Sequence, residues 1–230
     1  MTRRLIMARH GQTVYNATRR MQGQLDTALS DVGVAQAHEA ARLLEGRGIA
    51  RIVASDLERA ANTARIIAEH LGLPVTTDAR LRETHLGQWQ GKTHEEVDGA
   101  HPGARAVWRH DASWAPPGGE SRLEVARRAR PVIEEIMADY AEWDDATVLL
   151  VAHGGTIAAL TGSLLGLNKD QYPLLSGLSN AHWAQLTARP RYTPGSTDAL
   201  DPGTPGTAPR FAADTVAQAQ WYLDAWNMGA

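Results

Sequence analysis

Short apolar runs alternate with longer amphipathic stretches along most of the chain. The run at residues 147–152, with Val148-Leu149-Leu150-Val151 at its centre, predicts a central strand covered on both faces. Similar runs begin near the amino terminus and recur to the end of the chain. The segments predicted to be strands are 5–8, 51–54, 74–78, 147–152, 181–186 and 220–226.

Between these runs the apolar residues recur at helical spacing. Ser30 is placed to N-cap a helix that reaches about Gly46. Ser-x-x-Glu capping boxes at 55–58 and 121–124 predict helices that extend to Leu71, before Gly72, and to about residue 143. Residues 156–165 predict an apolar helix. Strands that alternate with helices in this way predict an α/β fold, with a mostly parallel central sheet and helices on both faces.

Two regions lack a regular pattern. Residues 81–119 are rich in His, Trp, Gly and Pro, and we expect irregular structure there. Residues 189–210 are rich in Pro and Gly and predict a long exposed loop. Neither region reads as a linker between domains, so we expect residues 1–230 to form a single domain.

Composition removes several classes of function. The 230 residues include no cysteine, which excludes disulfides, thiolate nucleophiles and Cys-ligated metal centres. A net charge of −3 lacks the basic field of a nucleic-acid binder, so no nucleic-acid partner is expected. The apolar run after Met1 is too short for a signal peptide, and no run is long enough to cross a membrane. We therefore expect a soluble cytoplasmic protein without a membrane partner.

Two histidines occupy matching positions in the pattern. His10 and His153 each follow a predicted strand, and each precedes a glycine. Ligands of open α/β sheets bind at the carboxyl ends of strands, so both imidazoles would face one crevice if their strands are neighbours. Arg9 adjoins the first histidine, and Arg59 lies in the first turn of a predicted helix. Arginines at such places favour an anionic ligand.

The sequence around these residues resembles the histidine phosphatase superfamily, whose members are phosphoglycerate-mutase-like. The motifs occur in the order of the family and cover residues 5 to about 165. They are Arg9-His10-Gly11-Gln12-Thr13 with Asn16, Arg20-Met21-Gln22-Gly23, Ser55-Asp56-Leu57-Glu58-Arg59-Ala60, Leu81-Arg82-Glu83, Gly87-x-Trp89-x-Gly91, Gly118-Gly119-Glu120-Ser121 and Val151-Ala152-His153-Gly154-Gly155. The resemblance implies the phosphoglycerate-mutase-like three-layer sandwich.

The resemblance also implies a role for each matching residue. His10 corresponds to the nucleophile that becomes a phosphohistidine, and Glu83 to the general acid. Two arginines and a protonated histidine would bind the phosphoryl oxygens, and they make a metal or other cofactor unnecessary. These three are Arg9, Arg59 and His153. The arginines should also keep His10 neutral. The predicted phosphate and substrate contacts are Asn16, Gln22, Gly23, the Gly154 backbone N–H and His85.

Several weaker candidates stay open at this point. His85 and His94 flank the Gly87-x-Trp89-x-Gly91 stretch, where each is either a substrate contact or an ordinary polar loop residue. Trp108 and Trp114 could line the substrate side, although most tryptophans belong to the core. Glu120 is either a site residue or a charge at a helix N-terminus.

Three functions are weighed: a phosphomonoesterase, a cofactor-dependent phosphoglycerate mutase, and a non-catalytic phosphate-binding module. The last is disfavoured because every catalytic position is filled. Mutases of the family usually carry Glu where this chain has Gln12, and they have a longer insertion than the segment between Glu83 and His153 allows. Further matching stretches, such as 111–121 and 223–227, resemble the branch that hydrolyses glucosyl-3-phosphoglycerate. This implies a small phosphate ester as substrate and a homodimer.

Overall fold

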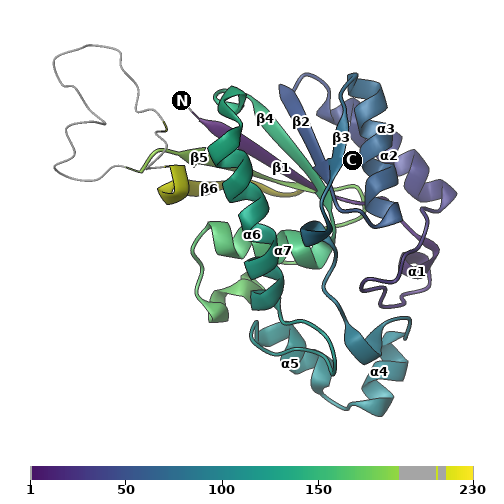
Figure 1. Cartoon of the computed structure of the whole chain (residues 1–230). Coiled ribbons are helices and arrows are strands. Elements are labelled where there is room, and N and C mark those ends of the chain that lie inside the picture. Colours follow the sequence, from purple (N-terminus) through teal and green to yellow (C-terminus); the bar gives the residue numbers. More distant parts are fainter. Residues whose placement is uncertain (1, 192–210, 212–215, 230) are drawn as a thin grey trace, which may run out of the picture.

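The computed structural model describes residues 2–191, 211 and 216–229, which form a central sheet between two layers of helices (Figure 1). Residues 192–210 of the predicted loop lie outside the described part of the chain. The strands are β1 (Arg3–Arg9), β2 (Ile49–Ala54), β3 (Val75–Thr77), β4 (Thr147–Ala152), β5 (Trp183–Arg189) and β6 (Gln220–Met228). Each predicted strand is confirmed, with ends shifted by a few residues.

The sheet has the order β3-β2-β4-β1-β5-β6. The strands β3, β2, β4 and β1 are parallel, whereas β5 runs antiparallel to β1 and β6 antiparallel to β5. Helical crossovers join the parallel strands, as expected for the alternating pattern. The mostly parallel α/β sheet is thus confirmed, and β1 and β4 are central neighbours.

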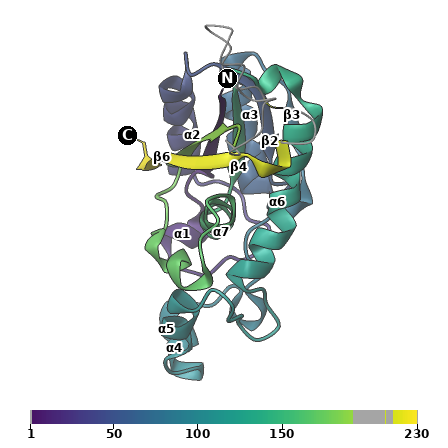
Figure 2. The same ribbon diagram turned by 90° about the vertical axis from the view of Figure 1, so that its left-hand side faces the viewer.

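In the described part of the chain, seven α-helices surround the sheet or extend from it. They are α1 (Val14–Ala17), α2 (Asp31–Leu44), α3 (Glu58–Leu71), α4 (His94–Ala100), α5 (Ala104–His110), α6 (Arg122–Asp139) and α7 (Gly154–Leu164). Short 3₁₀ helices occur at Ala79–Leu81, Gly87–Trp89, Ala141–Trp143, Lys169–Leu174 and Val216–Gln218. Figures 1 and 2 show α4 and α5 together at the bottom of both views, away from the sheet.

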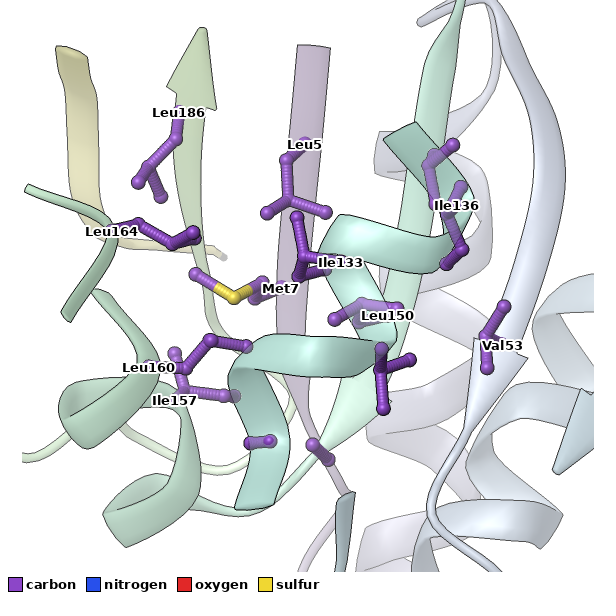
Figure 3. Packing of buried hydrophobic residues seen from close by; sticks show 14 of the residues in the cluster. Leu5, Met7, Val53, Ile133, Ile136, Leu150, Ile157, Leu160, Leu164 and Leu186 are labelled. Carbon is purple, nitrogen blue, oxygen red and sulfur yellow. The ribbon is translucent and has the colours of Figure 1, made fainter. Parts of the chain in front are cut away.

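The alternating sides of β1 explain the three layers. Leu5 and Met7 belong to a core cluster with α6 and α7, whereas Ile6 and Ala8 pack with α2 and α3 on the opposite face. Figure 3 shows the first cluster, in which Leu5, Met7 and Leu150 from the strands meet Ile133 and Ile136 of α6 and Ile157 and Leu160 of α7. A strand buried on both faces reads as a continuous apolar run, which is the pattern in the sequence.

The helix ends show where sequence patterns and structure diverge. Ser30 and Ser121 cap α2 and α6 through side-chain bonds, as predicted. The capping box predicted at Ser55 is wrong, because α3 begins with Leu57 as N-cap and no side chain caps it there. The helix predicted to reach residue 143 ends at Asp139, where the backbone turns so that Trp143 packs beneath β1 and its Nε1 donates to the Arg4 carbonyl.

Three short helices were not predicted. The helix α1 lies within the polar segment after His10, and α4 and α5 lie within the region expected to be irregular. The chain from α4 to α5 packs around a small cluster of its own, which includes the buried Trp89 and Val97 with Trp108 and Trp114 against it. This region supplies one wall of the cavity described below.

Candidate active site

His10 and His153 lie side by side because their strands do. β1 and β4 are paired in parallel with Arg9 opposite Ala152, so the next residue of each strand falls at the same edge of the sheet. The His10 amide donates to the Ala152 carbonyl at 3.0 Å. The two rings are 5.2 Å apart between centroids, and both side chains are buried.

The surroundings of His10 favour a neutral imidazole whose Nε2 carries no proton. Its Nδ1 lies 2.7 Å from the Gly11 carbonyl, which can only accept, so Nδ1 carries the proton. Its Nε2 then accepts from the Nε–H of Arg59 at 3.3 Å. Burial first, and then the charges of Arg9 and Arg59, hold the pKa of His10 well below its ordinary value of 6.5. Nε2 is therefore the ring nitrogen that could attack a ligand if the Arg59 guanidinium shifts from it.

Gly11 is required by the close packing behind His10. A Cβ at this position would lie 2.3 Å from the carbonyl oxygen of Gly33 in α2, closer than any side chain tolerates. The Gly11 amide also donates to the Thr63 hydroxyl at 3.1 Å, which ties the loop to α3. The turn after β1 is thus held on two sides, which fixes the position of the His10 backbone.

Arg59 is buried without an acidic partner. Its Nη1 and Nη2 donate to the carbonyls of Leu25 and Gly23, each at 2.8 Å, and the side chain is 1% exposed. Burial lowers the pKa of Arg59 to about 10, a value at which it stays charged at neutral pH. No ion pair of Arg59 occurs among the described residues.

Arg9 is the second cation at the site. Its Nη1 donates to the Leu178 carbonyl, and its buried Nε has no partner among the described residues. Burial lowers the pKa of Arg9, against the opposing effect of Glu83. A cation withdrawn from water without a paired carboxylate is costly, so the half-buried Arg9 and the buried Arg59 beside His10 make this corner of the molecule an anion site.

Glu83 is held at the N-terminus of α7. Its carboxylate accepts from the backbone amides of Gly155 and Thr156, each at 3.1 Å, and from the Thr84 amide at 2.8 Å. The N-terminus of a helix offers unpaired amides and a positive dipole end, which explains why a carboxyl group settles there. The carboxyl group lines the same cavity as His10.

Asn16 and Gln22 are oriented by their oxygen atoms. Asn16 Oδ1 accepts from the Asn180 side chain at 3.1 Å, and Gln22 Oε1 accepts from the Thr13 hydroxyl at 2.8 Å. The amide NH₂ groups are then the parts that can donate to a ligand. Gly23 lies beside them, with its carbonyl bound to Arg59 and a positive φ of 55°.

His153 is completely buried beside His10, and Gly154 after it begins α7 next to the Arg9 side chain. The sequence predicted a protonated imidazole here. The structure disagrees, because burial first and then Arg59 hold the pKa of His153 well below 6.5. His153 is therefore neutral in the free protein, and the positive charge of the site comes from the two arginines.

Most of these groups line a cavity of about 180 Å³, whereas His153 and Gly154 are not among its lining residues. Its lining combines residues from the ends of β1 and α3, from the segment around α1, and from the region between β3 and α6. They are Arg9, His10, Asn16, Arg20, Met21, Gln22, Gly23, Arg59, Glu83, Thr84, Leu86, Trp108 and Gly155. The cavity thus has a cationic end at His10 and an apolar wall formed by Met21, Leu86 and Trp108.

His85 does not line this cavity, contrary to the prediction. Its Nδ1 accepts from the Gly87 amide at 3.2 Å, and its own amide donates to Glu120 at 2.8 Å. Glu120 in turn pairs with Arg128, whose guanidinium donates to the Glu83 carbonyl at 2.9 Å. His85 and Glu120 therefore shape the loop that carries Glu83.

Of the remaining candidates Trp108, Trp114 and His94, one lines the cavity. Trp108 lines the cavity, whereas Trp114 packs on Trp89 with ring centroids 5.5 Å apart and His94 is exposed. Five other residues line the cavity without having been predicted as site residues, namely Arg20, Met21, Thr84, Leu86 and Gly155, and only Met21 and Leu86 carried a signal in the sequence. The signal was an apolar residue inside a polar motif, in Arg20-Met21-Gln22 and Thr84-His85-Leu86, where neither a helical nor a strand period accounts for it.

Two further searches concern other classes of site. Within the described residues, no group of three or more His, Cys, Asp or Glu side chains is arranged to hold a metal ion. None of the described helices is both long and apolar enough to span a membrane.

Comparison with known families identifies one that matches most of the chain. The model of the histidine phosphatase superfamily (branch 1) matches residues 5–193. A glucosyl-3-phosphoglycerate phosphatase of Mycolicibacterium vanbaalenii is 51% identical, over 99% of this chain and 96% of the relative. A protein of Yersinia pestis named "Probable phosphoglycerate mutase GpmB" is 36% identical, over 70% of this chain and 74% of the relative.

A solved structure matches the fold closely. It is described as a mycobacterial glucosyl-3-phosphoglycerate phosphatase in complex with VO3, and it superposes with a TM-score of 0.84 at 48% identity. The match covers 98% of each chain. The agreement therefore includes the strand ends that carry the site.

Proposed function

The chain belongs to the histidine phosphatase superfamily, and from this premise we propose that it hydrolyses a phosphate monoester through a phosphohistidine at His10. The observation that carries the proposal is the anion site around His10 Nε2. The half-buried Arg9 and the buried Arg59 have no ion pair there among the described residues, and Glu83 lines the same cavity. A phosphoryl group supplies the missing negative charge.

The first step would transfer the phosphoryl group to His10. Nε2 attacks phosphorus in line with the ester oxygen, a P–N bond forms, and the P–O bond to the alcohol breaks. In the free protein the Nε–H of Arg59 donates to Nε2. When substrate is bound, Arg59 and Arg9 would donate to the equatorial oxygens and stabilise their negative charge. Glu83, in its protonated form, would give its proton to the departing alkoxide.

The second step would return the site to its starting state. Glu83, now a carboxylate, removes a proton from water, and the water oxygen attacks the phosphorus of the phosphohistidine. The P–N bond breaks, and inorganic phosphate leaves with neutral His10 restored. The backbone amides at the start of α7 hold the Glu83 carboxylate for this role. Asn16 and Gln22 would donate to phosphoryl oxygens through their NH₂ groups, beside Gly23 and the Gly154 amide.

We propose glucosyl-3-phosphoglycerate as the substrate. The relatives named for this activity match the chain over nearly its whole length, which includes parts outside the catalytic motifs. The apolar wall at Met21, Leu86 and Trp108 leaves room beside the phosphoryl end for an organic group. Such a substrate is confined by its charge to the compartment where it is made, so we propose a cytoplasmic enzyme, acting as a homodimer as the family resemblance implies.

A mutase is the second candidate, because the relative from Yersinia pestis carries that name. It covers a smaller share of the chain at lower identity, and it therefore ranks below the phosphatase. A mutase would convert 3-phosphoglycerate to 2-phosphoglycerate without net release of phosphate. The two functions are separated by one assay that follows both products.

The direct test is a panel of phosphomonoesters assayed with EDTA. Glucosyl-3-phosphoglycerate, 3-phosphoglycerate and p-nitrophenyl phosphate should all release phosphate, with the highest kcat/KM for the first. Loss of activity in EDTA would contradict the metal-free mechanism. Formation of 2-phosphoglycerate without phosphate release would replace the phosphatase with the mutase.

The intermediate can be trapped independently of the substrate. Rapid quenching with a ³²P-labelled monoester should give a phosphoprotein that is acid-labile and alkali-stable, as a P–N bond requires. His10→Ala should give none. An acid-stable adduct would place the phosphoryl group on Ser or Thr and overturn the role of His10.

A further inference from the structure

Ser55 does not perform the capping role that its sequence predicts. Ser55 follows β2 directly, and its amide donates to the Val151 carbonyl of the neighbouring β4 at 2.9 Å. This pairing places its side chain beside the end of β4, where His153 follows. The Ser55 hydroxyl lies 2.9 Å from Nε2 of His153 and is fully buried.

The start of α3 is satisfied from elsewhere in the chain. The Glu58 amide donates to Asp26 Oδ1 at 2.7 Å, so a carboxylate from the loop after α1 takes the place of the predicted Ser55 cap. The Leu57 amide is 3.3 Å from the Ser55 oxygen. The helix uses Ser55 only as an acceptor, through the Leu57 amide, so the hydroxyl proton can be donated to His153.

The ring of His153 has one nitrogen left for a ligand. Nε2 is hydrogen-bonded to the Ser55 hydroxyl, whereas Nδ1 is buried and has no hydrogen-bond partner among the described residues. The ring stands beside His10, with centroids 5.2 Å apart. A buried imidazole nitrogen without a partner is costly, and a phosphoryl oxygen on His10 would supply one.

The position of the ring proton depends on which group donates in the bond between Ser55 and His153. A serine oxygen accepts up to two hydrogen bonds and donates one. The Leu57 amide uses one acceptor site, and a proton donated by Ser55 to Nε2 places the ring proton of neutral His153 on Nδ1. Neutral His153 can then act as a hydrogen-bond donor to an anion, although it carries no charge in the free protein.

We propose that Ser55 is a positioning residue that holds His153 in the Nδ1–H tautomer, so that Nδ1 donates to a phosphoryl oxygen at His10. The inference rests on the proposed function for the ligand, but the tautomer itself belongs to the free protein. It explains how His153 assists phosphoryl transfer while neutral. It also explains why the serine at this position is buried beneath the site instead of at a helix end.

The first experiment reads the tautomer without any assay. Long-range ¹H–¹⁵N correlation spectra of the ¹⁵N-labelled protein at neutral pH, with His153 assigned through His153→Gln, should show the proton on Nδ1 and an unprotonated Nε2. Addition of inorganic phosphate should shift the Nδ1–H resonance. A ring protonated on Nε2 in the free protein would overturn the proposal, whatever the activity of the enzyme.

The second experiment uses three variants that differ in a buried hydroxyl. Ser55→Ala should lower kcat about 10- to 100-fold with little change in KM, because one misplaced donor weakens the transition state more than binding. Ser55→Thr keeps the hydroxyl and should recover much of the loss. Thr147→Val is the matched control, since its buried hydroxyl bonds the Arg47 carbonyl at the opposite end of β4. It should leave kcat unchanged.

The outcomes separate this proposal from the proposed function. If the wild-type protein hydrolyses no phosphomonoester, the function fails, while the tautomer measurement still decides the role of Ser55. If the wild type is active but Ser55→Ala retains full kcat, or loses no more than Thr147→Val, the positioning role is refuted. Circular dichroism and Tm of each variant identify a loss that comes only from unfolding.

Discussion

Each end of β1 lies beside a buried arginine, Arg3 at the amino end and Arg59 next to the half-buried Arg9 at the carboxyl end, and the environments of these arginines differ. At the amino end, Arg3 forms an ion pair with Asp144 at 2.7 Å and donates to the Met137 carbonyl. At the carboxyl end, Arg9 and Arg59 lie beside His10 with carbonyl partners and without an ion pair among the described residues. One end is electrostatically complete, whereas the other keeps an excess of positive charge.

The difference distinguishes a structural charge from a functional one. Burial of a cation is costly, and the usual compensation is a carboxylate at hydrogen-bond distance, as at Arg3. The carboxyl end of β1 gives up this compensation in the free protein. A bound phosphoryl dianion would restore it, so stability is traded there for affinity towards an anion. Four measurements test this contrast.

The largest effect is expected from removal of the uncompensated charge. Arg59→Met should lower kcat/KM for p-nitrophenyl phosphate by roughly 10³- to 10⁵-fold, as for other arginines that stabilise phosphoryl transfer. The same variant should lose less stability than Arg3→Met, because removal of a buried cation without an ion pair offsets the lost bonds to the Gly23 and Leu25 carbonyls. A large fall in Tm would show that Arg59 is a structural residue and would remove the contrast.

The opposite result is expected at the amino end of the strand. Arg3→Met should lower the free energy of unfolding by about 1–3 kcal/mol, because the Met137 carbonyl and the partly exposed Asp144 lose their donor. Its kcat/KM should match that of the wild type. Denaturant unfolding and the phosphatase assay on the same preparation check both. Activity that falls without loss of stability would contradict the assignment.

The pH dependence of stability should reside at the carboxyl end. The pKa values of His10 and His153 are lowered in the folded protein, whereas both return to about 6.5 in the unfolded chain. Below pH 6.5 the unfolded chain then binds more protons than the folded one. Stability is therefore present above this pH and lost as the pH falls towards the lowered values.

The measurement is Tm as a function of pH for the wild type and for His10→Asn. The variant removes one of the two groups, so its Tm should fall less steeply below pH 6.5. Saturating inorganic phosphate should flatten the curve of the wild type, because the anion stabilises the protonated imidazoles. Equal slopes for both proteins would mean that the histidines are not the source.

The smallest change in activity is expected at His85, which lies just outside the cavity. His85→Ala should change kcat/KM by less than about threefold, well below the roughly 10²- to 10⁴-fold contribution of a general acid. Its Nδ1 accepts from the Gly87 amide and lies outside the cavity. Glu83→Gln is the matched comparison on the same loop and should lose the full general-acid contribution. Similar losses in both variants would place His85 in the site after all.

The local patterns and the motifs carried much of this picture from the sequence alone. The apolar run around Leu149 predicted a strand buried on both faces, and the repeated placement of His10 and His153 after strands pointed to one edge of a sheet. Motif resemblance pointed to Arg59 and Glu83. These features depend on short stretches of sequence and on the direction of strands, which local chemistry determines.

Other features depended on which distant segments meet. The Ser55-x-x-Glu58 pattern fits a capping box, but β2 lies beside β4, so the hydroxyl of Ser55 reaches His153 and Asp26 caps the helix instead. Trp108, which belongs to α5, lines the cavity. His85 lies outside it, because its ring is bonded to the Gly87 amide of its own loop. The neutral state of His153 follows from its burial, which no sequence motif predicts.

The absence of cysteine excluded a thiolate nucleophile, and the order of the motifs indicated the histidine phosphatase family, for which we propose His10 as the nucleophile. The tertiary structure decided the protonation states and the partners of each group. Those depend on desolvation and on hydrogen bonds between residues far apart in the chain, such as Ser55 with His153 and Glu83 with Thr156. Such contacts exist only when the strands are paired and the helices are packed against them.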